Sequence, residues 1–284
     1  MNAGRGPSLR VDAHHHVWRL DRGDYGWLTP ALAPIYRDFG LDDLKPLLAS
    51  AGIDATVLVQ AAPTVAETEY LLRVAQDSKG LVRGVVGWVD LAAFDAVSTL
   101  ERLVRDPTLK SIRPMLQDLP DPDWILREVV GRALSALPPL GLRFDALVKP
   151  PQLSALLLLQ ERHPDLDIVI DHGGKPAIAA HEWEPWARHV AALARNPRVE
   201  CKLSGLVTEA GPDWTVDRLR RYVDHLLVCF GPHRLLWGSD WPVVDLAGGY
   251  RRWFDATDAL LSGLPVADRE AILGGNARRF YGLD

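Results

Sequence analysis

Cysteine is scarce in this chain, which has two among its 284 residues, Cys201 and Cys229. Two cysteines cannot build the disulfide framework of a small secreted domain, and their separation differs from that of the CxxC pairs in metal knuckles. The cysteine content therefore predicts a protein of the reducing cytoplasm.

Long apolar segments are also missing. The longest apolar stretch, 153–159, is interrupted by Ser154 and is far too short to cross a bilayer. Residues 1–10 carry Arg5 and Arg10 but lack the apolar core of a secretory signal. We therefore expect neither a membrane anchor nor a membrane partner.

Positive charge is not in excess either. Lys and Arg number 32 against 37 Asp and Glu, which gives a formal net charge of −5. This balance provides no electrostatic reason to expect a nucleic acid as partner. With 48% hydrophobic and 24% charged residues, the composition is that of an ordinary globular protein, and small-molecule chemistry is the best starting hypothesis.

The chain does contain a repeat of short apolar or β-branched runs, each followed by a segment with helical periodicity. The eight runs lie at 9–12, 55–60, 82–89, 109–115, 142–148, 167–171, 199–203 and 235–239. The helical segments include 65–77, 94–105, 152–163, 183–196 and 216–230. Strands that alternate with helices pair in parallel, and eight of them predict a (β/α)8 barrel.

No linker or shift in composition divides the chain, so residues 1–284 are predicted to form a single domain. Two segments exceed a minimal barrel. The segment at about 20–40 is rich in Trp, Tyr and Pro, and the segment at about 248–284 predicts a C-terminal helical tail. The first is either a loop that covers a substrate or a packed aromatic loop without a ligand.

Polar side chains follow the ends of the predicted strands, where barrel enzymes place their active sites. In strand order these residues are His14 and His16, Gln60, Asp90, Arg113 and Gln117, Asp145 and Lys149, His172, Lys202 and Ser204, and Asp240. Their distribution predicts one polar site at the C-terminal end of the barrel.

The run Asp12-Ala13-His14-His15-His16 places four ionisable side chains within five residues. On a strand, side chains two residues apart point the same way, so His14 and His16 share a face that His15 does not. Neutral imidazoles on one face can bind zinc or a similar metal. The alternative is that three successive histidines near the N-terminus belong to a tag or a solvated turn.

Two further candidates end later strands. His172 precedes Gly173-Gly174, where a ligand or another backbone can approach closely, although a histidine here can also be a satisfied core residue. Asp240 follows an apolar strand. Its carboxylate can ligate a metal, take a proton from water or cap the next turn.

Substrate contacts are expected from the remaining polar and aromatic candidates. Arg113 offers a planar guanidinium to substrate oxygens, or else pairs with a structural partner. Lys175 and Lys202 are similar candidates. A serine nucleophile is not expected, because the last glycine of a G-x-S-x-G elbow is missing after Ser239. The predicted substrate-binding residues are Arg113, Gln60, Trp27, Gln117, Lys149 and Trp241.

Together these motifs resemble the amidohydrolase superfamily, and more narrowly its amidohydrolase-2 branch of sugar lactonases and 2-pyrone-4,6-dicarboxylate lactonases. The similarity lies in the segments 11–16, 171–176, 201–205, 238–242 and 275–281. The segments 25–28, 36–39 and 116–118 look most like the L-fuconolactone and L-rhamnonolactone hydrolases. The resemblance implies that His14, His16, His172 and Asp240 are metal-site or catalytic residues and that Arg113 contacts substrate.

One departure from the superfamily limits the metal content. Binuclear amidohydrolases take a further histidine and a carboxylated lysine or a glutamate from their middle strands, but the segment 142–148 contains no histidine. We therefore expect at most one divalent ion, with zinc as the predicted metal. Some lactonases of this branch work without an essential metal, so the requirement stays open.

The resemblance predicts that activated water opens the lactone ring of a sugar acid such as L-fuconolactone or L-rhamnonolactone. Asp240 would be the general base, and His172, with a metal on His14 and His16 if one binds, would polarise the carbonyl. The alternatives are a dicarboxylate or muconate-type lactone as substrate, a decarboxylase of the aminocarboxymuconate-semialdehyde type, or a sugar-acid binding protein without catalysis. Whether the chain forms a homo-oligomer stays open.

Overall fold

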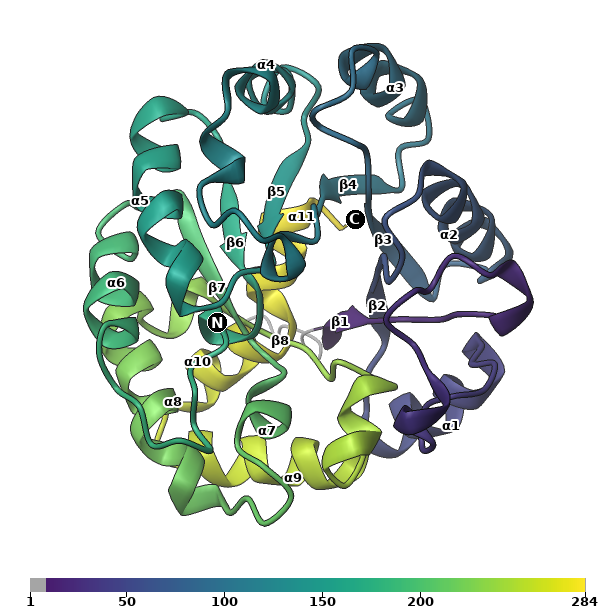
Figure 1. The fold of residues 1–284 in the computed structure, drawn as a ribbon. Coiled ribbons are helices and arrows are strands. Elements are labelled where there is room, and N and C mark those ends of the chain that lie inside the picture. Colours follow the sequence, from purple (N-terminus) through teal and green to yellow (C-terminus); the bar gives the residue numbers. More distant parts are fainter. Residues whose placement is uncertain (1–8, 284) are drawn as a thin grey trace, which may run out of the picture.

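The computed structural model describes residues 9–283, which form eight parallel strands in the order β1 to β8. Residues 1–8 and 284 lie outside the described residues. They include most of the N-terminal segment 1–10 and both ends of the predicted domain. The strands are β1 (Val11–His15), β2 (Ala55–Val59), β3 (Val82–Gly87), β4 (Leu109–Ile112), β5 (Arg143–Ala146), β6 (Ile168–Ile170), β7 (Val199–Leu203) and β8 (Leu235–Trp237). Figure 1 looks along the barrel that they form. The predicted single-domain (β/α)8 fold is confirmed.

The barrel closes where β8 meets β1. His15 and Trp241 form a parallel bridge, and the backbone N–H of Asp240 donates to the carbonyl of His14 over 2.8 Å. A Cβ atom on Gly238 would lie 2.6 Å from the Cβ of His14, so only glycine allows this approach. The closure places the histidines of β1 beside the carboxylate that follows β8.

Helices surround the strands in Figure 1. The predicted segments 65–77 and 216–230 match two of these helices, α2 and α8. Each helix is preceded by a threonine, Thr64 or Thr215, whose side chain accepts a hydrogen bond from the helical backbone. Among the described helices, none combines the length and the hydrophobicity that a membrane span requires. The helices are α1 (Leu41–Ala51), α2 (Val65–Asp77), α3 (Ala96–Leu103), α4 (Glu128–Ala136), α5 (Leu153–Arg162), α6 (Trp186–Leu193), α7 (Leu206–Glu209), α8 (Val216–Phe230), α9 (Tyr250–Leu261), α10 (Val266–Glu270) and α11 (Asn276–Tyr281).

The first strand differs most from its predicted position. The prediction placed it at 9–12, whereas β1 runs from Val11 to His15 with every residue buried. Its polar residues are all buried, His14 at the polar site inside the barrel, Asp12 against Ser239 and His15 against Thr56, so hydrophobicity does not mark where the strand ends. The register between β1 and β2 also shifts between Asp12 and His15.

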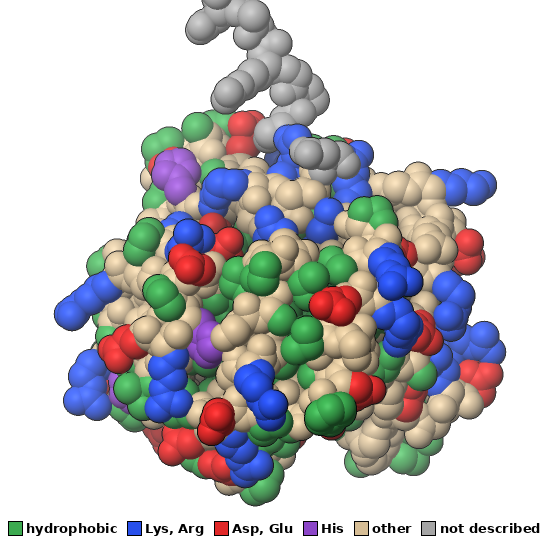
Figure 2. All heavy atoms as spheres, turned by 90° about the horizontal axis from the view of Figure 1, so that it is seen from above, with side chains coloured by type: hydrophobic (Ala, Val, Ile, Leu, Met, Phe, Trp, Pro, Cys, Tyr) green, Lys and Arg blue, Asp and Glu red, His purple; other side chains and the backbone are tan. Residues whose placement is uncertain are grey.

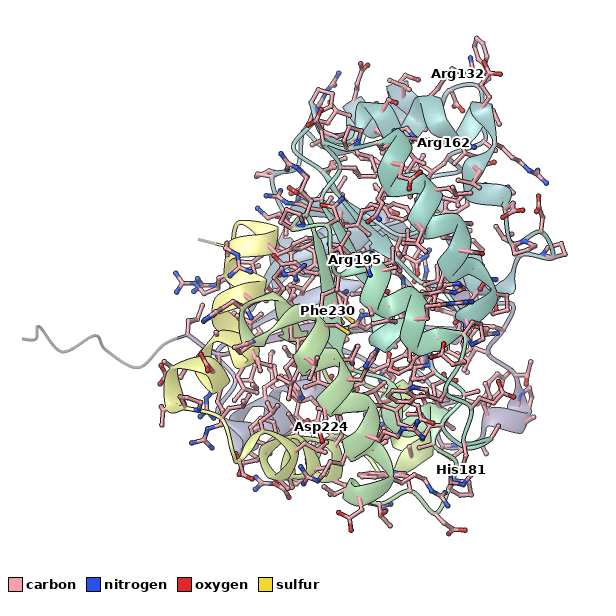
Figure 3. All side chains as sticks on the ribbon, turned by 90° about the vertical axis from the view of Figure 1, so that its left-hand side faces the viewer. Arg132, Arg162, His181, Arg195, Asp224 and Phe230 are labelled. Carbon is pink, nitrogen blue, oxygen red and sulfur yellow. The ribbon has the colours of Figure 1, made fainter. Side chains whose placement is uncertain are left out.

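The C-terminal segment is helical but is more than a tail. Helix α9 packs against α1 and α8 and takes the eighth position in the outer ring. The π-helical segment Ala271–Gly275 and α11 pack against β1 and β8. Residues of α11 join strand residues in an apolar cluster at the N-terminal end of the barrel. Figure 3 shows the last of these helices, in yellow, at the end of the molecule opposite His181.

The outer surface carries charges of both signs. Figure 2 shows lysine and arginine side chains interspersed with aspartate and glutamate on the face drawn, without one large area of a single sign. On that face the charge distribution agrees with the mixed composition of the sequence.

Candidate active site

A cavity of about 280 Å³ opens at the C-terminal ends of the strands. The segment 20–40, which an antiparallel bridge between Trp18 and Phe39 closes at its base, contributes Trp27 and Leu32 to the wall. The predicted aromatic loop therefore borders the cavity. The other lining residues are His16, Ala61, Arg113, Met115, Gln117, Asp118, Leu147, His172, Lys175, Asp240, Val243 and Leu246.

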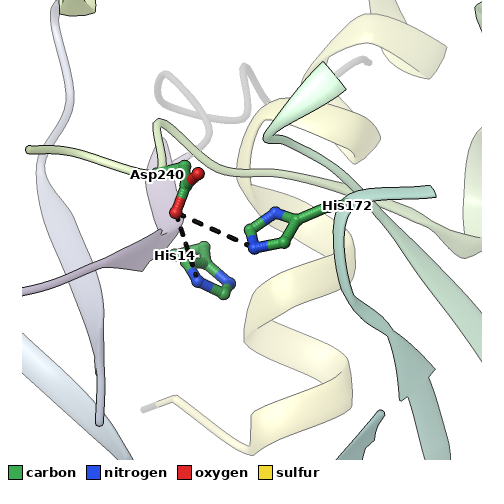
Figure 4. Close-up of side chains that lie close together, drawn as sticks. All are labelled: His14, His172 and Asp240. Atoms are coloured by element: carbon green, nitrogen blue, oxygen red, sulfur yellow. Dashed lines mark ion pairs between the residues drawn. The ribbon is translucent and has the colours of Figure 1, made fainter. Parts of the chain in front are cut away.

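Three histidines converge on one carboxylate at the base of this cavity. The Oδ1 atom of Asp240 lies 3.4 Å from Nε2 of His16, 3.7 Å from Nε2 of His14 and 3.8 Å from Nε2 of His172. Figure 4 shows the part of the cluster formed by His14, His172 and Asp240, each of which offers one donor atom within 4.8 Å of the others. Histidine and carboxylate donors at this spacing form a possible metal site.

Hydrogen bonds at Nδ1 orient two of these imidazoles. The carbonyl of Val59 lies 2.8 Å from Nδ1 of His16, so this nitrogen donates and Nε2 presents its lone pair to the cluster. Nδ1 of His172 lies 2.8 Å from the hydroxyl of Ser204. Ser204, which the sequence placed among the polar residues at strand ends, thus orients His172.

The backbone around His172 is shaped to hold its ring. The residues from His172 to Lys175 have positive φ angles between 48° and 72°, an uncommon conformation for residues other than glycine. A Cβ atom on Gly205 would lie 2.5 Å from the imidazole of His172. The Gly173-Gly174 pair and Gly205 therefore permit a turn and a contact that larger residues would prevent.

The charge states at the cluster follow from burial and from neighbouring groups. Burial favours a raised pKa for Asp240, but the imidazoles of His172, His16 and His14 outweigh it and hold this pKa well below its ordinary value. Burial lowers the pKa of His172 to about 4. At neutral pH the cluster therefore contains an ionised carboxylate beside a neutral imidazole of His172.

Arg113 borders the cavity, but protein partners occupy its donors. Its Nη2 and Nε atoms donate to Oε1 of Gln60 over 2.7 and 3.2 Å, and Nη2 also donates to the Gln60 carbonyl. Nη1 contacts Oδ2 of Asp171 at 3.1 Å and Nε2 of His14 at 3.4 Å. A guanidinium has five N–H groups, so this side chain is held rigidly and has little capacity left for a substrate.

A second buried cation lies below Arg113. The Nζ atom of Lys202 lies 2.5 Å from Oδ2 of Asp145, 2.9 Å from Oδ1 of Asp171 and 3.1 Å from Nδ1 of His14. All four residues are fully buried. Lys202 and Asp145, which the sequence placed at strand ends, therefore lie beneath the cavity and support it.

The other predicted contact residues divide into two groups. Trp27 and Gln117 border the cavity. Gln60 is fully buried behind Arg113, and Trp241 is 2% exposed and packs edge-on against Phe39. Three more candidates lie outside the lining of the cavity. The Lys149 side chain is 46% exposed near Asp118. The carboxylate of Asp90 accepts a hydrogen bond from the backbone of Ala92, and the imidazole of His15 contacts the hydroxyl of Thr56.

Sequence reasoning assigned no role to Asp171, which links Arg113, Lys202 and His14. It also overlooked the apolar part of the cavity wall. The only available signal for Asp171 was its place directly before His172 at the end of a buried strand. The apolar wall residues that were not predicted are Leu32, Met115, Leu147, Val243 and Leu246.

A buried glutamate holds the loop after β2 against the cavity. The carboxylate of Glu67 accepts hydrogen bonds from the backbone of Ala61 and Ala62, and the carbonyl of Ala61 accepts one from Nε1 of Trp27 over 2.7 Å. Burial raises the pKa of Glu67 to about 7. The fold therefore favours the protonated form of this group more than the unfolded chain does.

Glu67→Gln is expected to change how stability depends on pH. Because the pKa of Glu67 is raised in the fold, the wild-type free energy of unfolding loses roughly 3 kcal/mol from this group as the pH rises from about 4.5 to 7. The variant lacks this loss, so the difference in the free energy of unfolding between the wild type and the variant should change with pH. Urea unfolding at pH 5 and pH 7.5 measures it, and parallel pH curves would contradict the assignment.

The chain is similar to known proteins over nearly all of its length. The amidohydrolase family profile matches residues 11–283. A protein named L-fucono-1,5-lactonase from Burkholderia ambifaria is 47% identical over 98% of this chain and 97% of its own length. A protein with the same name from Burkholderia multivorans is 35% identical, with 97% of each chain covered.

A solved structure agrees in both fold and extent. The crystal structure of an amidohydrolase from Burkholderia multivorans with bound zinc is 35% identical in sequence and superimposes with a TM-score of 0.90. The match covers 97% of this chain and all of the crystallised chain.

Proposed function

The chain belongs to the amidohydrolase family, and from that premise we propose that it hydrolyses the lactone ring of a sugar acid, with L-fucono-1,5-lactone as its substrate. The observation that carries this proposal is the ionised carboxylate of Asp240, which lies among three histidines at the base of a small cavity. The names of the two relatives support the choice of substrate.

The residues of the cluster divide the chemical work. Asp240 borders the cavity with its carboxylate ionised, so it can take a proton from a water molecule that attacks the lactone carbonyl. The neutral imidazole of His172 can donate a hydrogen bond to the carbonyl oxygen, because the Ser204 hydroxyl can act as a donor to its Nδ1. These roles need no covalent intermediate on the protein.

The donor set also suits a single divalent cation, for which we propose zinc. His14, His16, His172 and Asp240 would bind the ion, and His16 is fixed with its Nε2 lone pair toward the cluster. With the ion bound, His14 and His172 would ligate through Nε2 in the tautomers whose Nδ1 carries the proton, toward Asp171 and Ser204 respectively, and His172 would then not donate a hydrogen bond to the substrate. When bound, zinc acts as a Lewis acid and lowers the pKa of water. The support for zinc is the similar amidohydrolase structure that contains it.

The zinc proposal predicts a stoichiometry. After incubation with zinc and removal of excess metal, elemental analysis should give one equivalent per chain, and His172→Asn should bind less. Asp90→Asn, which alters an exposed carboxylate away from the cavity, should bind the same amount as wild type. Two tightly bound equivalents would contradict the single site.

The cavity wall favours an uncharged polyhydroxy lactone over a dicarboxylate. Apart from the histidines, the basic side chains among the described lining residues are those of Arg113 and Lys175. Arg113 is occupied by protein partners, and Nζ of Lys175 lies 2.7 Å from a carboxylate oxygen of Glu209. A second substrate carboxylate would therefore lack a free cation, whereas Lys175 and Gln117 can form hydrogen bonds with hydroxyl groups.

A comparison of substrates tests the proposed function. Initial rates with L-fucono-1,5-lactone, L-rhamnonolactone and 2-pyrone-4,6-dicarboxylate should give a kcat/KM for the sugar lactones that is at least about 100-fold higher than that for the dicarboxylate. Faster turnover of the dicarboxylate would reverse the assignment. Binding of the sugar lactones without turnover would make the chain a binding protein.

The cytoplasmic location remains a prediction from composition. Cys201 and Cys229 are free thiols in the structure, and Cys201 is buried. This state agrees with a reducing compartment.

A further inference from the structure

The last turn of the chain reaches the polar network beneath the active site. Tyr281, at the end of α11, is fully buried, and its hydroxyl donates a 2.8 Å hydrogen bond to Oδ2 of Asp145 on β5. Helix α11 packs at the N-terminal end of the barrel, as Figure 1 shows by its place behind the strands, whereas the cavity opens at the C-terminal end. The phenol therefore approaches the network from the side opposite the substrate.

A continuous series of contacts leads from Tyr281 to the cavity. Oδ2 of Asp145, which accepts from Tyr281, also accepts from Lys202. Lys202 then contacts Nδ1 of His14 and Oδ1 of Asp171. Three residues thus separate the C-terminal helix from the carboxylate of Asp240, since Nε2 of His14 faces Asp240 at 3.7 Å.

The position of the Lys202 ammonium depends on the balance between its partners. An ammonium group has three N–H donors, and the structure provides three acceptors, Asp145, Asp171 and His14. The hydroxyl of Tyr281 stabilises the negative charge of Asp145 and so weakens the attraction of that carboxylate for Lys202. Without the hydroxyl, the ammonium should move toward Asp145 and away from His14, because charge attraction is strong where water is absent.

We propose that Tyr281 is a positioning residue for hydrolysis, which acts through Asp145 and Lys202 to set the orientation of His14. This inference rests on the proposed lactone hydrolysis for its kinetic effect but not for its effect on the imidazole. Tyr281 does not touch the cavity, and neither do Asp145 and Lys202. The contribution of this residue should therefore appear in kcat and not in KM.

A purely structural role is the competing explanation. Tyr281 packs edge-on against Phe280 with ring centroids 4.9 Å apart and belongs to the apolar cluster at the floor of the barrel. Tyr281→Phe keeps that ring and removes only the hydroxyl. It therefore separates packing from the hydrogen bond to Asp145.

Steady-state kinetics of Tyr281→Phe with L-fucono-1,5-lactone give the first test. The expected result is a kcat about fivefold to tenfold below wild type, with KM within about twofold. Tyr222→Phe is the matched control, because it also removes only the hydroxyl of a buried tyrosine. The hydroxyl of Tyr222 donates a 2.9 Å hydrogen bond to the carbonyl of Glu182 on the outside of the barrel. A wild-type kcat in Tyr281→Phe, with or without a lower Tm, would overturn the proposal.

A double-mutant cycle tests the route of the effect. In the Asp145→Asn background, Tyr281→Phe should lower kcat by less than about twofold, because the residue through which the hydroxyl acts has already been changed. Equal effects of Tyr281→Phe in both backgrounds would show that the phenol acts by another route.

Nitrogen NMR tests the inference without any substrate. In protein labelled with ¹⁵N-histidine, the His14 signals, assigned by their loss in His14→Asn, should shift in Tyr281→Phe and stay in place in Tyr222→Phe. Unchanged His14 signals would contradict the positioning role even if lactone hydrolysis is established. Shifted signals in a protein without lactonase activity would refute the proposed function and leave the structural link supported.

Discussion

Asp240→Asn is expected to lower kcat for L-fucono-1,5-lactone by about 10³-fold, while KM changes little. The substitution keeps the shape of the side chain and removes its ability to take a proton. Asp240 has a positive φ of 59°, a conformation that asparagine also tolerates, so the backbone should keep its path. Steady-state kinetics at neutral pH measure the effect.

The matched control is Asp90→Asn, which makes the same chemical change after β3. Asp90 is exposed and accepts a hydrogen bond from Ala92, outside the lining of the cavity. Its variant should keep wild-type kinetics. Near wild-type turnover in Asp240→Asn would remove the general base from the mechanism.

Arg113→Met is expected to lower the free energy of unfolding by about 3–5 kcal/mol. The side chain of Arg113 is 3% exposed, and its ion-pair partner Asp171 is fully buried. Methionine fills much of the same volume but leaves a carboxylate oxygen of Asp171 and the Oε1 atom of Gln60 without their donor. Lactone hydrolysis should also fall, because Arg113 borders the cavity and contacts His14.

Arg102→Met provides the comparison for this prediction. Arg102 pairs with Glu69 over 2.7 Å, but the two side chains are 49% and 40% exposed. Exposed pairs contribute about 1 kcal/mol or less, so this variant should remain close to wild type in stability and in activity. Chemical denaturation of both variants compares the two pairs, and equal losses would show that burial of the Arg113 pair adds nothing.

Much of the fold could be predicted from the sequence because apolar periodicity reports burial against the outer helices. The segments 65–77 and 216–230 match α2 and α8, and 199–203 matches β7. The pattern was less informative where a strand faces a polar interior. Strand β1 illustrates this limit, since His14 is buried at the polar cluster and Asp12 is buried against Ser239, although their polarity resembles that of a strand end or loop.

The candidate site could be predicted in part because barrel topology brings strand ends together. That rule placed His14, His16, His172 and Asp240 in one region, and the structure has all four at the cluster. It could not distinguish a side chain that borders the cavity from one beneath it. That distinction depends on how far along its strand each residue lies. An error of one residue in the predicted end of a strand is enough to hide it.

The sequence also could not show that protein partners already occupy the N–H donors of Arg113. Arg113 was expected to bind substrate oxygens with its guanidinium, but Gln60 and Asp171 occupy most of its donors. Gln60 comes from a strand far away in sequence, and its amide faces Arg113 because of the closed barrel. The role of Tyr281 depends on the same closure, since the C-terminal helix must pass under the barrel to reach Asp145.

Acid release from L-fucono-1,5-lactone is the most direct test of the proposed hydrolysis. In a pH-stat at neutral pH, purified wild-type protein should release one proton for each lactone consumed, at a rate that increases in proportion to enzyme concentration. Asp240→Asn at the same concentration should release acid about 10³-fold more slowly after subtraction of spontaneous hydrolysis. Acid release by the wild-type protein no faster than the spontaneous reaction would contradict the central claim.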